Sequence, residues 1–490
     1  MNVVHRRRAG RVAATAAACA LLCAALGPAH AGLRRAGNGL ELDAALKAAG
    51  AGDTVMLAAG TWTDVQVCIR NSGTPERPLV VMAEEGGKTV LNGASQLQIG
   101  GSNVVVDGLL FKGGALESGS VIEFRDGSSA EAVGSRLTNC AVIDYNPPDD
   151  RTEYKWVSLY GRRNRVDHCF FEGKNHQGCL LVVWLDEVPD SHRVDRNLFG
   201  RRPLLGRNGA EIIRIGTSDW SMHNSRTVVE ENVFVECDGE HEIISNKSCE
   251  NVYRGNTFIR SKGALTLRHG NRCVVEGNFF FGEGVDSTGG VRIIGEDHRV
   301  YNNYFQDLRG TGFYSALSMV LGIPDGPLNG YFQVKNAQVV FNTFVHCRKA
   351  LTVGFVRDRA EATLPPLGCV VANNVILGDG GSLIEELAAP VGMRYEANVM
   401  NGGQVILKVP APMPLKDPRL EKSPDGLWRP AAGSPARGAA AGAFPYVAED
   451  MDGQPRPERK DAGADQASDA PVRRKPLVPS ETGPPWMHRN

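Results

Sequence analysis

The sequence has few aromatic residues and almost no net charge. Aromatic residues make up 7% of its 490 residues, and 54 Lys and Arg side chains nearly balance 55 Asp and Glu, which leaves a formal net charge of −1. A chain with no surplus of positive charge has no global electrostatic attraction for nucleic acid or for an anionic membrane. Affinity for a charged polymer therefore has to come from a local cluster of side chains.

Long apolar runs are also rare, and one of them lies at the start of the chain. Residues 1–31 begin with the basic stretch MNVVHRRRAG, continue with the apolar stretch RVAATAAACALLCAALG and end with the small-residue motif Ala29–Ala31. This order is typical of a cleaved signal peptide. The apolar stretch is shorter than the roughly 20 residues of a membrane-spanning helix. We therefore expect export to the periplasm or the exterior, and no membrane span.

The eleven cysteines lack the spacing of a metal site. Cys19 and Cys23 fall in the predicted signal peptide, and the other nine are scattered without a CxxC pair. An odd number of cysteines cannot all pair within one chain. We expect most of them to be small buried residues, and the sequence leaves open whether some form disulfides.

Glycine is abundant, with 57 residues, and it accompanies an internal repeat. A few β-forming residues are followed by an asparagine and then by an apolar residue two places on. The spacing is 22 residues from Asn256 to Asn278 and 25 from Asn278 to Asn303, and the longer gaps fit one repeat plus a loop. The repeated asparagines are Asn197, Asn232, Asn256, Asn278, Asn303, Asn342, Asn374 and Asn398.

A fixed period of this size indicates a solenoid. Short β runs between Gly, Asn and Asp, with no long amphipathic helical windows, predict an all-β, single-domain, right-handed parallel β-helix over residues 32–408. The stacked asparagines would form a ladder at one bend. Residues 39–62 predict a short capping helix followed by a strand. Residues 409–490 are rich in Pro, Ala, Gly and charge, which predicts a C-terminal cap and an irregular tail, partly disordered toward Asn490.

The stretch GEHEIISNKS, residues 239–248, places charges beside core residues. Glu240 and Glu242 are two apart, so on an extended chain their side chains point to the same face. Adjacent carboxylates repel each other unless a cation lies between them, and their oxygens suit Ca²⁺. Asn208 lies 32 residues before Glu240, about one coil plus a loop, so its amide oxygen is a candidate third ligand.

Basic residues recur in phase with these carboxylates. Lys247 is five residues after Glu242 and would face away from it unless a bend at Ser245–Asn246 resets the alternation. Arg268 follows Lys247 by 21 residues and Arg292 follows Arg268 by 24, so we expect a column of positive charge. Four more arginines lie nearby, at positions 201, 202, 207 and 214. A single Glu–Lys pair is common on solenoid surfaces, but this repetition favours a site for a polyanion.

Four segments resemble polysaccharide lyase family 6, which includes alginate lyases and chondroitinase B. They are NGAEIIRIG, HEIISNKS, NTFIRSKGALTLRHGN and GGVRIIGEDHRVYNNYF, within a similarity that extends from about Gly39 to Met400. Ala210 stands where the family usually has a second glycine. The resemblance implies a secreted β-helix enzyme that cleaves uronate polysaccharides by Ca²⁺-assisted β-elimination. It implies that Asn208, Glu240 and Glu242 bind calcium, Lys247 is the base, Arg268 is the acid, and His269 and Arg292 bind substrate.

Alginate is the first choice of substrate, and three alternatives stay open. The family's dermatan-acting member carries an adjacent arginine pair for sulfate, whereas here Asp358 separates Arg357 from Arg359. The alternatives are a dermatan sulfate lyase, a non-catalytic β-helix glycan-binding or surface protein, and a pectin-type hydrolase. The last would need paired aspartates, and Asp195 and Asp238 show no such pairing. The sequence leaves the oligomeric state open.

Overall fold

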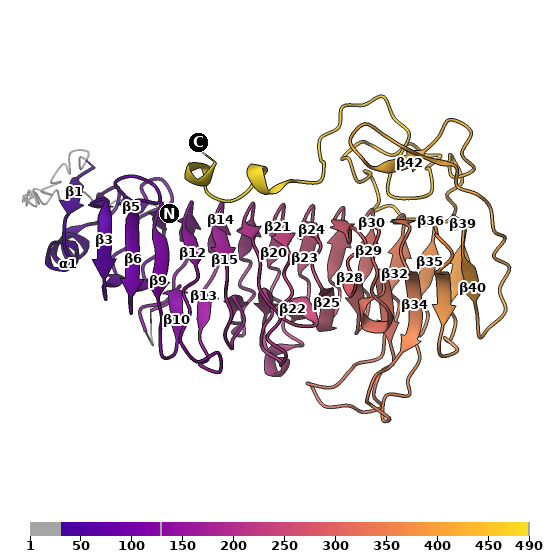
Figure 1. Ribbon diagram of the computed structural model, residues 1–490, viewed down its shortest axis with the longest axis horizontal. Helices are drawn as coiled ribbons and strands as arrows, with labels where there is room; N and C mark the ends of the chain where they lie inside the picture. Colours follow the sequence, from indigo (N-terminus) through magenta and orange to yellow (C-terminus); the bar gives the residue numbers. More distant parts are fainter. Residues whose placement is uncertain (1–30, 128–129, 489–490) are drawn as a thin grey trace, which may run out of the picture.

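The computed structural model, which describes residues 31–127 and 130–488, is a right-handed parallel β-helix, as predicted (Figure 1). From β2 (Thr54–Leu57) to β37 (Ser382–Glu386), each strand pairs in parallel with the strand three places on, so three strands make one coil. Over the described residues, sheet 1 has 14 strands, from β1 (Leu33–Ala36) to β38 (Arg394–Glu396), sheet 2 has 13, from β3 (Gly60–Thr63) to β39 (Val399–Asn401), and sheet 3 has 13, from β4 (Gln66–Ile69) to β40 (Gln404–Ile406). The predicted signal peptide falls almost entirely outside the described residues.

The core consists of apolar side chains that stack from coil to coil. Seven phenylalanines form one such column inside sheet 2, with neighbouring ring centroids 4.6–5.5 Å apart. They are Phe171, Phe199, Phe234, Phe258, Phe280, Phe305 and Phe344. Rings at this separation bury each other's faces, which fixes the register of one coil on the next. Six of these seven rings lie two places after a repeated asparagine, from Phe199 after Asn197 to Phe344 after Asn342.

The repeated asparagines form the predicted ladder. Seven of the eight asparagines, from Asn197 to Asn374, donate a side-chain N–H group to the Oδ1 of the asparagine in the next coil, at 2.9–3.1 Å. The same Oδ1 also accepts the backbone N–H of the preceding asparagine, as in Asn278 and Asn303 at 3.0 Å. The ladder therefore satisfies buried backbone groups at the bend, and these residues are structural.

A short helix covers the N-terminal end of the solenoid. Helix α1 (Gly39–Ala48) begins after Asn38, whose side chain accepts the Glu41 N–H at 3.0 Å. Leu42 and Leu46 face the first coils and are buried. The helix thereby covers the open edge of the core, as the sequence predicted.

The C-terminal segment returns along the outside of the β-helix. After the antiparallel pair β41 (Leu420–Lys422) and β42 (Trp428–Pro430), the chain runs back toward the N-terminal coils and ends near β14 (Arg165–Asp167) (Figure 1). Residues 471–488, the C-terminal strap, include two short 3₁₀ helices, Pro479–Glu481 and Pro485–Met487.

The strap packs against the outer face of sheet 2. That face carries apolar side chains, among them Ala141, Phe170, Leu198 and Val233, and the strap covers them with Leu477, Trp486 and Met487. Trp486 Nε1 donates to the Asn139 carbonyl at 2.7 Å. The sequence predicts disorder toward Asn490, whereas residues as far as His488 are packed, because an apolar stripe on the solenoid offers them a partner.

The nine described cysteines are free thiols, and eight of them are buried. They fill small spaces in the coils, in agreement with the expectation for most of them. In the described part of the chain, no helix combines the length and the apolar composition needed to cross a bilayer.

Candidate active site

The predicted site residues gather on the outer face of sheet 3. The strands concerned are β19 (Ile213–Ile215), β22 (Glu242–Lys247), β25 (Gly263–His269), β28 (Thr288–Ile293) and β31 (Leu317–Val320). One row of outward positions runs through Arg214, Ser245, Thr266, Arg292 and Ser318. The expected column of Lys247, Arg268 and Arg292 does not form a single row. In the strand register, Arg292 lies in the row of Ser245, whereas Lys247 pairs with His269.

A bulge in β22 turns Lys247 toward the glutamates. The prediction of a bend at Ser245–Asn246 is wrong, because β22 continues through both residues. The pairing with β25 shifts between Glu242 and Ile244, and Ile243 and Ile244 both lie in the core. Two consecutive inward side chains reset the alternation of the strand. Glu242 and Lys247 consequently face the same side.

Three carboxylates meet at the centre of the site. Oxygens of Glu211, Glu240 and Glu242 all lie within 4.8 Å of one another. Burial and the neighbouring Glu211 and Glu242 carboxylates raise the pKa of Glu240 to about 8. Glu211 is 2% exposed, and its Oε2 has no hydrogen-bond partner among the described residues. An orphaned buried oxygen within a group of mutually repelling carboxylates fits a hard cation such as Ca²⁺.

Glu211 is a site residue that the sequence reasoning missed. It ends the NGAE motif and lies 29 residues before Glu240, so the motif and the coil spacing together could have revealed it. Asn208, the predicted ligand from this motif, is exposed, and its carbonyl accepts from Gln177 Nε2 at 2.6 Å. The following residue, Gly209, donates its N–H to Glu240 Oε2 at 3.0 Å. The NGAE motif therefore contributes both the Glu211 side chain and the Gly209 backbone N–H to the carboxylate cluster.

Two arginines face Glu242. Arg292 forms an ion pair with Glu242 Oε1, while the Arg268 Nε atom lies 3.9 Å from the same oxygen. Ser245 also donates its hydroxyl to Glu242. Burial alone would raise the pKa of Glu242, but Arg292 and Arg268 outweigh it and hold the pKa below its ordinary value. The two arginines therefore favour the charged form of Glu242.

Arg268 is held away from water by a loop that follows β31. Its Nη1 and Nη2 donate to the carbonyls of Gly330 and Asn329, each at 3.0 Å, and its side chain is 13% exposed. Burial lowers the pKa of Arg268 below the usual value. Next to it, His269 is buried, and burial together with Arg268 and Lys247 lowers the pKa of His269 to about 2. His269 is thus a neutral side chain, with its Nε2 3.3 Å from Ser218 Oγ.

Two clefts flank this centre. One, of about 570 Å³, is lined by Lys247, Arg214, residues 217–219 and residues 327–329. The other, of about 510 Å³, is lined by Asp286, Ser287, Phe313, Tyr314, Phe355, residues 309–312 and the arginines at positions 348 and 357. Between the two clefts, His241 contacts the Tyr314 hydroxyl and accepts from Arg357 Nη2 at 3.3 Å. The first cleft thus contains Lys247, and the second is lined by the arginines at positions 309, 348 and 357.

The other predicted arginines divide into two groups. Arg202 is buried and donates to three backbone carbonyls, so it supports the coils. Arg207 bonds the loop residues Gln177 and Asp150, and Arg201 is exposed. Arg214 alone of these four lines the cleft beside Lys247, with its guanidinium 5.3 Å from the Trp184 ring centroid.

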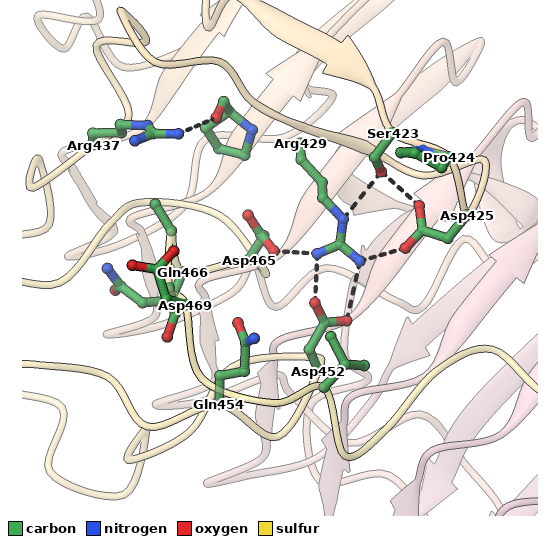
Figure 2. Close-up of a pocket in the computed structure, with 14 residues that line it drawn as sticks. Ser423, Pro424, Asp425, Arg429, Arg437, Asp452, Gln454, Asp465, Gln466 and Asp469 are labelled. Carbon is green, nitrogen blue, oxygen red and sulfur yellow. Dashed lines mark hydrogen bonds and ion pairs between the residues drawn. The ribbon is translucent and has the colours of Figure 1, made fainter.

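A second acidic group, in the C-terminal segment, is structural. It borders a cavity of about 710 Å³ that none of the predicted site residues lines. Figure 2 shows Arg429 at its centre, paired with Asp425 at 2.6 Å, with Asp452 at 2.5 Å and with Asp465. Asp450 has oxygens close to those of Asp452 and Asp465, but it accepts backbone N–H groups of residues 452, 454 and 466. The guanidinium and these amides already bond the carboxylate oxygens, which gives the group a structural role.

The fold and the site together define a parallel β-helix protein whose grooved outer face combines a carboxylate cluster with lysine and arginine. Residues 37–436 match the family model of chondroitinase B. Solved structures similar to the chain are described as PL6 family lyases. The chain belongs to this family, polysaccharide lyase family 6, as its motifs predicted.

Three solved structures illustrate the similarity. The PL6 family alginate lyase AlyGC is 37% identical, with a TM-score of 0.79 over 82% of this chain and 55% of its own. A mannuronic acid specific family 6 lyase from the human gut microbiota is 33% identical, with a TM-score of 0.66 over 74% of this chain and 82% of its own. A PL6 family lyase from Pseudopedobacter saltans is 27% identical, with a TM-score of 0.69 over 92% and 99%.

The chain spans little more than half the length of AlyGC, because the match covers 55% of that chain. Comparison with curated proteins gives no match.

Proposed function

We propose that this chain is an exported polysaccharide lyase that cleaves alginate by Ca²⁺-assisted β-elimination and leaves an unsaturated uronate end. The observation that carries the proposal is the placement of Lys247 and Arg268 on the same face as the Glu211, Glu240 and Glu242 cluster. A base, a cation site and a guanidinium beside one groove are the groups that elimination from a uronate requires. Family membership supports the reaction class, and the N-terminal pattern supports export.

The C5 proton of a uronate is only weakly acidic, and a cation at the site would make it easier to remove. A Ca²⁺ ion bound at the site would act as a Lewis acid that neutralises the adjacent substrate carboxylate. Glu240, Glu242 and Asn208 are the ligands that the family resemblance implies, and Glu211 joins them through its orphaned oxygen. Because Arg292 pairs with Glu242, it holds that carboxylate charged and fixed. The family resemblance also implies that Arg292 binds substrate.

Lys247 is the proposed base and Arg268 acts on the departing oxygen. Lys247 lines one cleft, and in its neutral form it takes the C5 proton of a uronate that lies there. Arg268 then stabilises the negative charge that develops on O4. A guanidinium gives up its proton reluctantly, so the final proton to O4 is relayed by water that Arg268 orients. His269, neutral and bonded to Ser218, helps to bind the sugar.

Two observations favour alginate over dermatan sulfate. Solved relatives at 33% and 37% identity are described as mannuronic acid specific and as an alginate lyase. In this chain Arg357 already bonds His241, and Arg359 lies 4.6 Å from the Tyr331 centroid, while Asp358 between them is 88% exposed. An exposed carboxylate between two engaged arginines disfavours a sulfate group.

The direct test is incubation of the purified chain with alginate and with dermatan sulfate, with and without a chelator. The expected result is a rise in ultraviolet absorbance from the unsaturated product with alginate, abolished by the chelator and restored by Ca²⁺. Product from dermatan sulfate alone would reverse the choice of substrate. Binding of alginate without any product would favour the non-catalytic glycan-binding alternative. A Lys247→Ala variant should bind alginate and release product far more slowly than the wild type.

A further inference from the structure

Two aromatic rings stand behind the two arginines that face Glu242. The Arg268 guanidinium carbon lies 4.4 Å from the Tyr331 ring centroid, and that of Arg292 lies 4.6 Å from the Phe313 centroid. The two rings are 8% and 5% exposed and meet edge to face, with their centroids 6.3 Å apart. Each site arginine therefore rests on a buried ring, at a distance where the ring's electrons attract a cation.

Each ring also holds a second arginine from another loop. Arg359 lies 4.6 Å from the Tyr331 centroid, and Arg357 lies 5.4 Å from the Phe313 centroid. Both come from the connection after β34 (Lys349–Phe355). The two loops are joined by backbone hydrogen bonds in both directions between Gly322 and Leu364, at 2.8 and 2.9 Å. Tyr331 thus belongs to a double-loop wall and not to a free flap, and Phe313, in the 3₁₀ helix Gly312–Tyr314, meets it edge to face.

The wall holds Arg268 at a specific distance from Glu242. Its two terminal nitrogens donate to the carbonyls of Asn329 and Gly330, which lie two residues and one residue before Tyr331. Its Nε stays 3.9 Å from Glu242 Oε1, which is too long for a hydrogen bond, whereas Arg292 contacts that oxygen directly. Without the ring and the two carbonyls, the Arg268 side chain could close that gap and pair with Glu242.

We infer that Tyr331 is a positioning residue that keeps Arg268 off the Glu242 carboxylate, so that its guanidinium remains available to the departing sugar oxygen. Arg359 supports the same ring from its own loop. This inference rests on the proposed lyase function and adds to it a requirement for an aromatic ring at position 331. The requirement is for the ring and not for the phenol, because the ring face is what attracts the guanidinium.

The test compares Tyr331→Phe with Tyr331→Leu, using kcat and KM for alginate and a thermal melt of each variant. We expect Tyr331→Phe to match the wild type. Tyr331→Leu should lower kcat by about tenfold to a hundredfold and change KM by less than about threefold, because a misplaced group that acts in the transition state affects the rate more than substrate binding. In an Arg268→Ala background, Tyr331→Leu should cause no further loss, since the group it positions is gone.

Arg359→Ala provides a second variant if Tyr331→Leu fails to fold, because the Arg359 side chain is 37% exposed. It should lower kcat by about threefold with KM unchanged. Equal rates for Tyr331→Phe and Tyr331→Leu, a pure rise in KM in either variant, or additive losses with Arg268→Ala would overturn the positioning role alone. No product from the wild-type chain would instead overturn the proposed function, and this inference with it.

Discussion

Lys247 and Glu242 face the same side of strand β22, although an odd number of residues separates them. The extra residue in the bulge at Ile243–Ile244 makes this possible, since both isoleucines enter the core. Across the strand pair, Arg268 is the additional residue of β25, because Asn246 pairs with Leu267 and Lys247 with His269. Two bulges in neighbouring strands thus bring the proposed base and the leaving-group arginine toward one carboxylate cluster.

Replacement of Lys247 by alanine should remove the proposed base and leave the fold intact. We expect kcat for alginate to fall by about 10²–10⁴-fold, the usual contribution of a general base, while the melting temperature stays within a few degrees of the wild type. Lys262→Ala is the matched control, because Lys262 is an exposed lysine just before β25 that pairs with Asp238 at 3.6 Å. Equal losses in both variants would contradict a special role for Lys247.

Calcium should stabilise the protein through Glu211. A ligand that binds only the folded state raises the melting temperature, so added Ca²⁺ should raise that of the chelator-treated wild type, and Mg²⁺ should do so less. Glu211→Gln should abolish the shift and reduce lyase activity. Glu250→Gln, which changes a carboxylate that pairs with Arg226 and Arg272 outside the cluster, should retain it. An undiminished calcium shift in Glu211→Gln would exclude that residue as a ligand.

The buried histidines should contribute a loss of stability as the pH drops below about 6.5, because they must be protonated on unfolding. Burial lowers the pKa of His298 to about 4, even though Asp297 opposes the change, and burial lowers those of His176 and His192 to about 3. Unfolded histidines bind protons below about 6.5. These three side chains therefore hold more protons in the unfolded state between about pH 4 and 6.5, and their contribution to the free energy of unfolding rises with pH across this window.

The substitution His298→Asn tests the contribution of one of these histidines. His298 Nδ1 accepts the Cys273 N–H at 3.1 Å, and in another coil Asn164 Oδ1 accepts the Ser135 N–H at 2.8 Å. Asparagine can therefore replace the acceptor without titrating. The slope of unfolding free energy against pH, measured by urea denaturation, should decrease by up to about 1.4 kcal/mol per pH unit in this window. An unchanged slope would show that His298 is already protonated in the folded state or exchanges no proton on unfolding.

The repeat predicted most of the fold because a parallel β-helix is built from local periodicity. Asn278 and its neighbours are separated by one coil, so their spacing alone gave the ladder. Glu240, Glu242 and Lys247 were predicted as site residues from one short stretch. The bulge was missed, because two isoleucines in succession do not show which of them departs from the alternation. Tyr331 was also missed, since its place over Arg268 depends on a loop 62 residues away from that arginine, as the bond to Gly330 indicates.

Removal of residues 476–490 should lower stability and leave the chemistry unchanged. The strap covers apolar side chains on sheet 2, whereas the candidate site lies on sheet 3. Loss of about 1.5–3 kcal/mol for each large apolar side chain that leaves the surface should lower the melting temperature by several degrees and increase the binding of a hydrophobic dye. The lyase rate of the folded molecules should be unaffected.

The substitution Trp486→Ala tests a single contact of the strap and should also lower the melting temperature. Val478→Ser is the control and should leave the melting temperature unchanged, because Val478 is 47% exposed. Trp486 lies against Gly86 and Gly87, where an added Cβ would come within 2.6 and 2.5 Å of the indole. Equal melting temperatures for wild type and Trp486→Ala would mean that the strap lies on the solenoid without stabilising it.

The strap also sets an order of assembly. In a solenoid each coil touches only its neighbours, so early coils can form while later ones are still being synthesised. Trp486, however, bonds Asn139, 347 positions earlier in the chain. Until the strap emerges, the outer stripe of sheet 2 stays bare and can stick to another molecule. Packing of the strap is therefore a late event that joins it to coils formed much earlier, and a chain terminated before the strap would leave this stripe exposed however well its coils had folded.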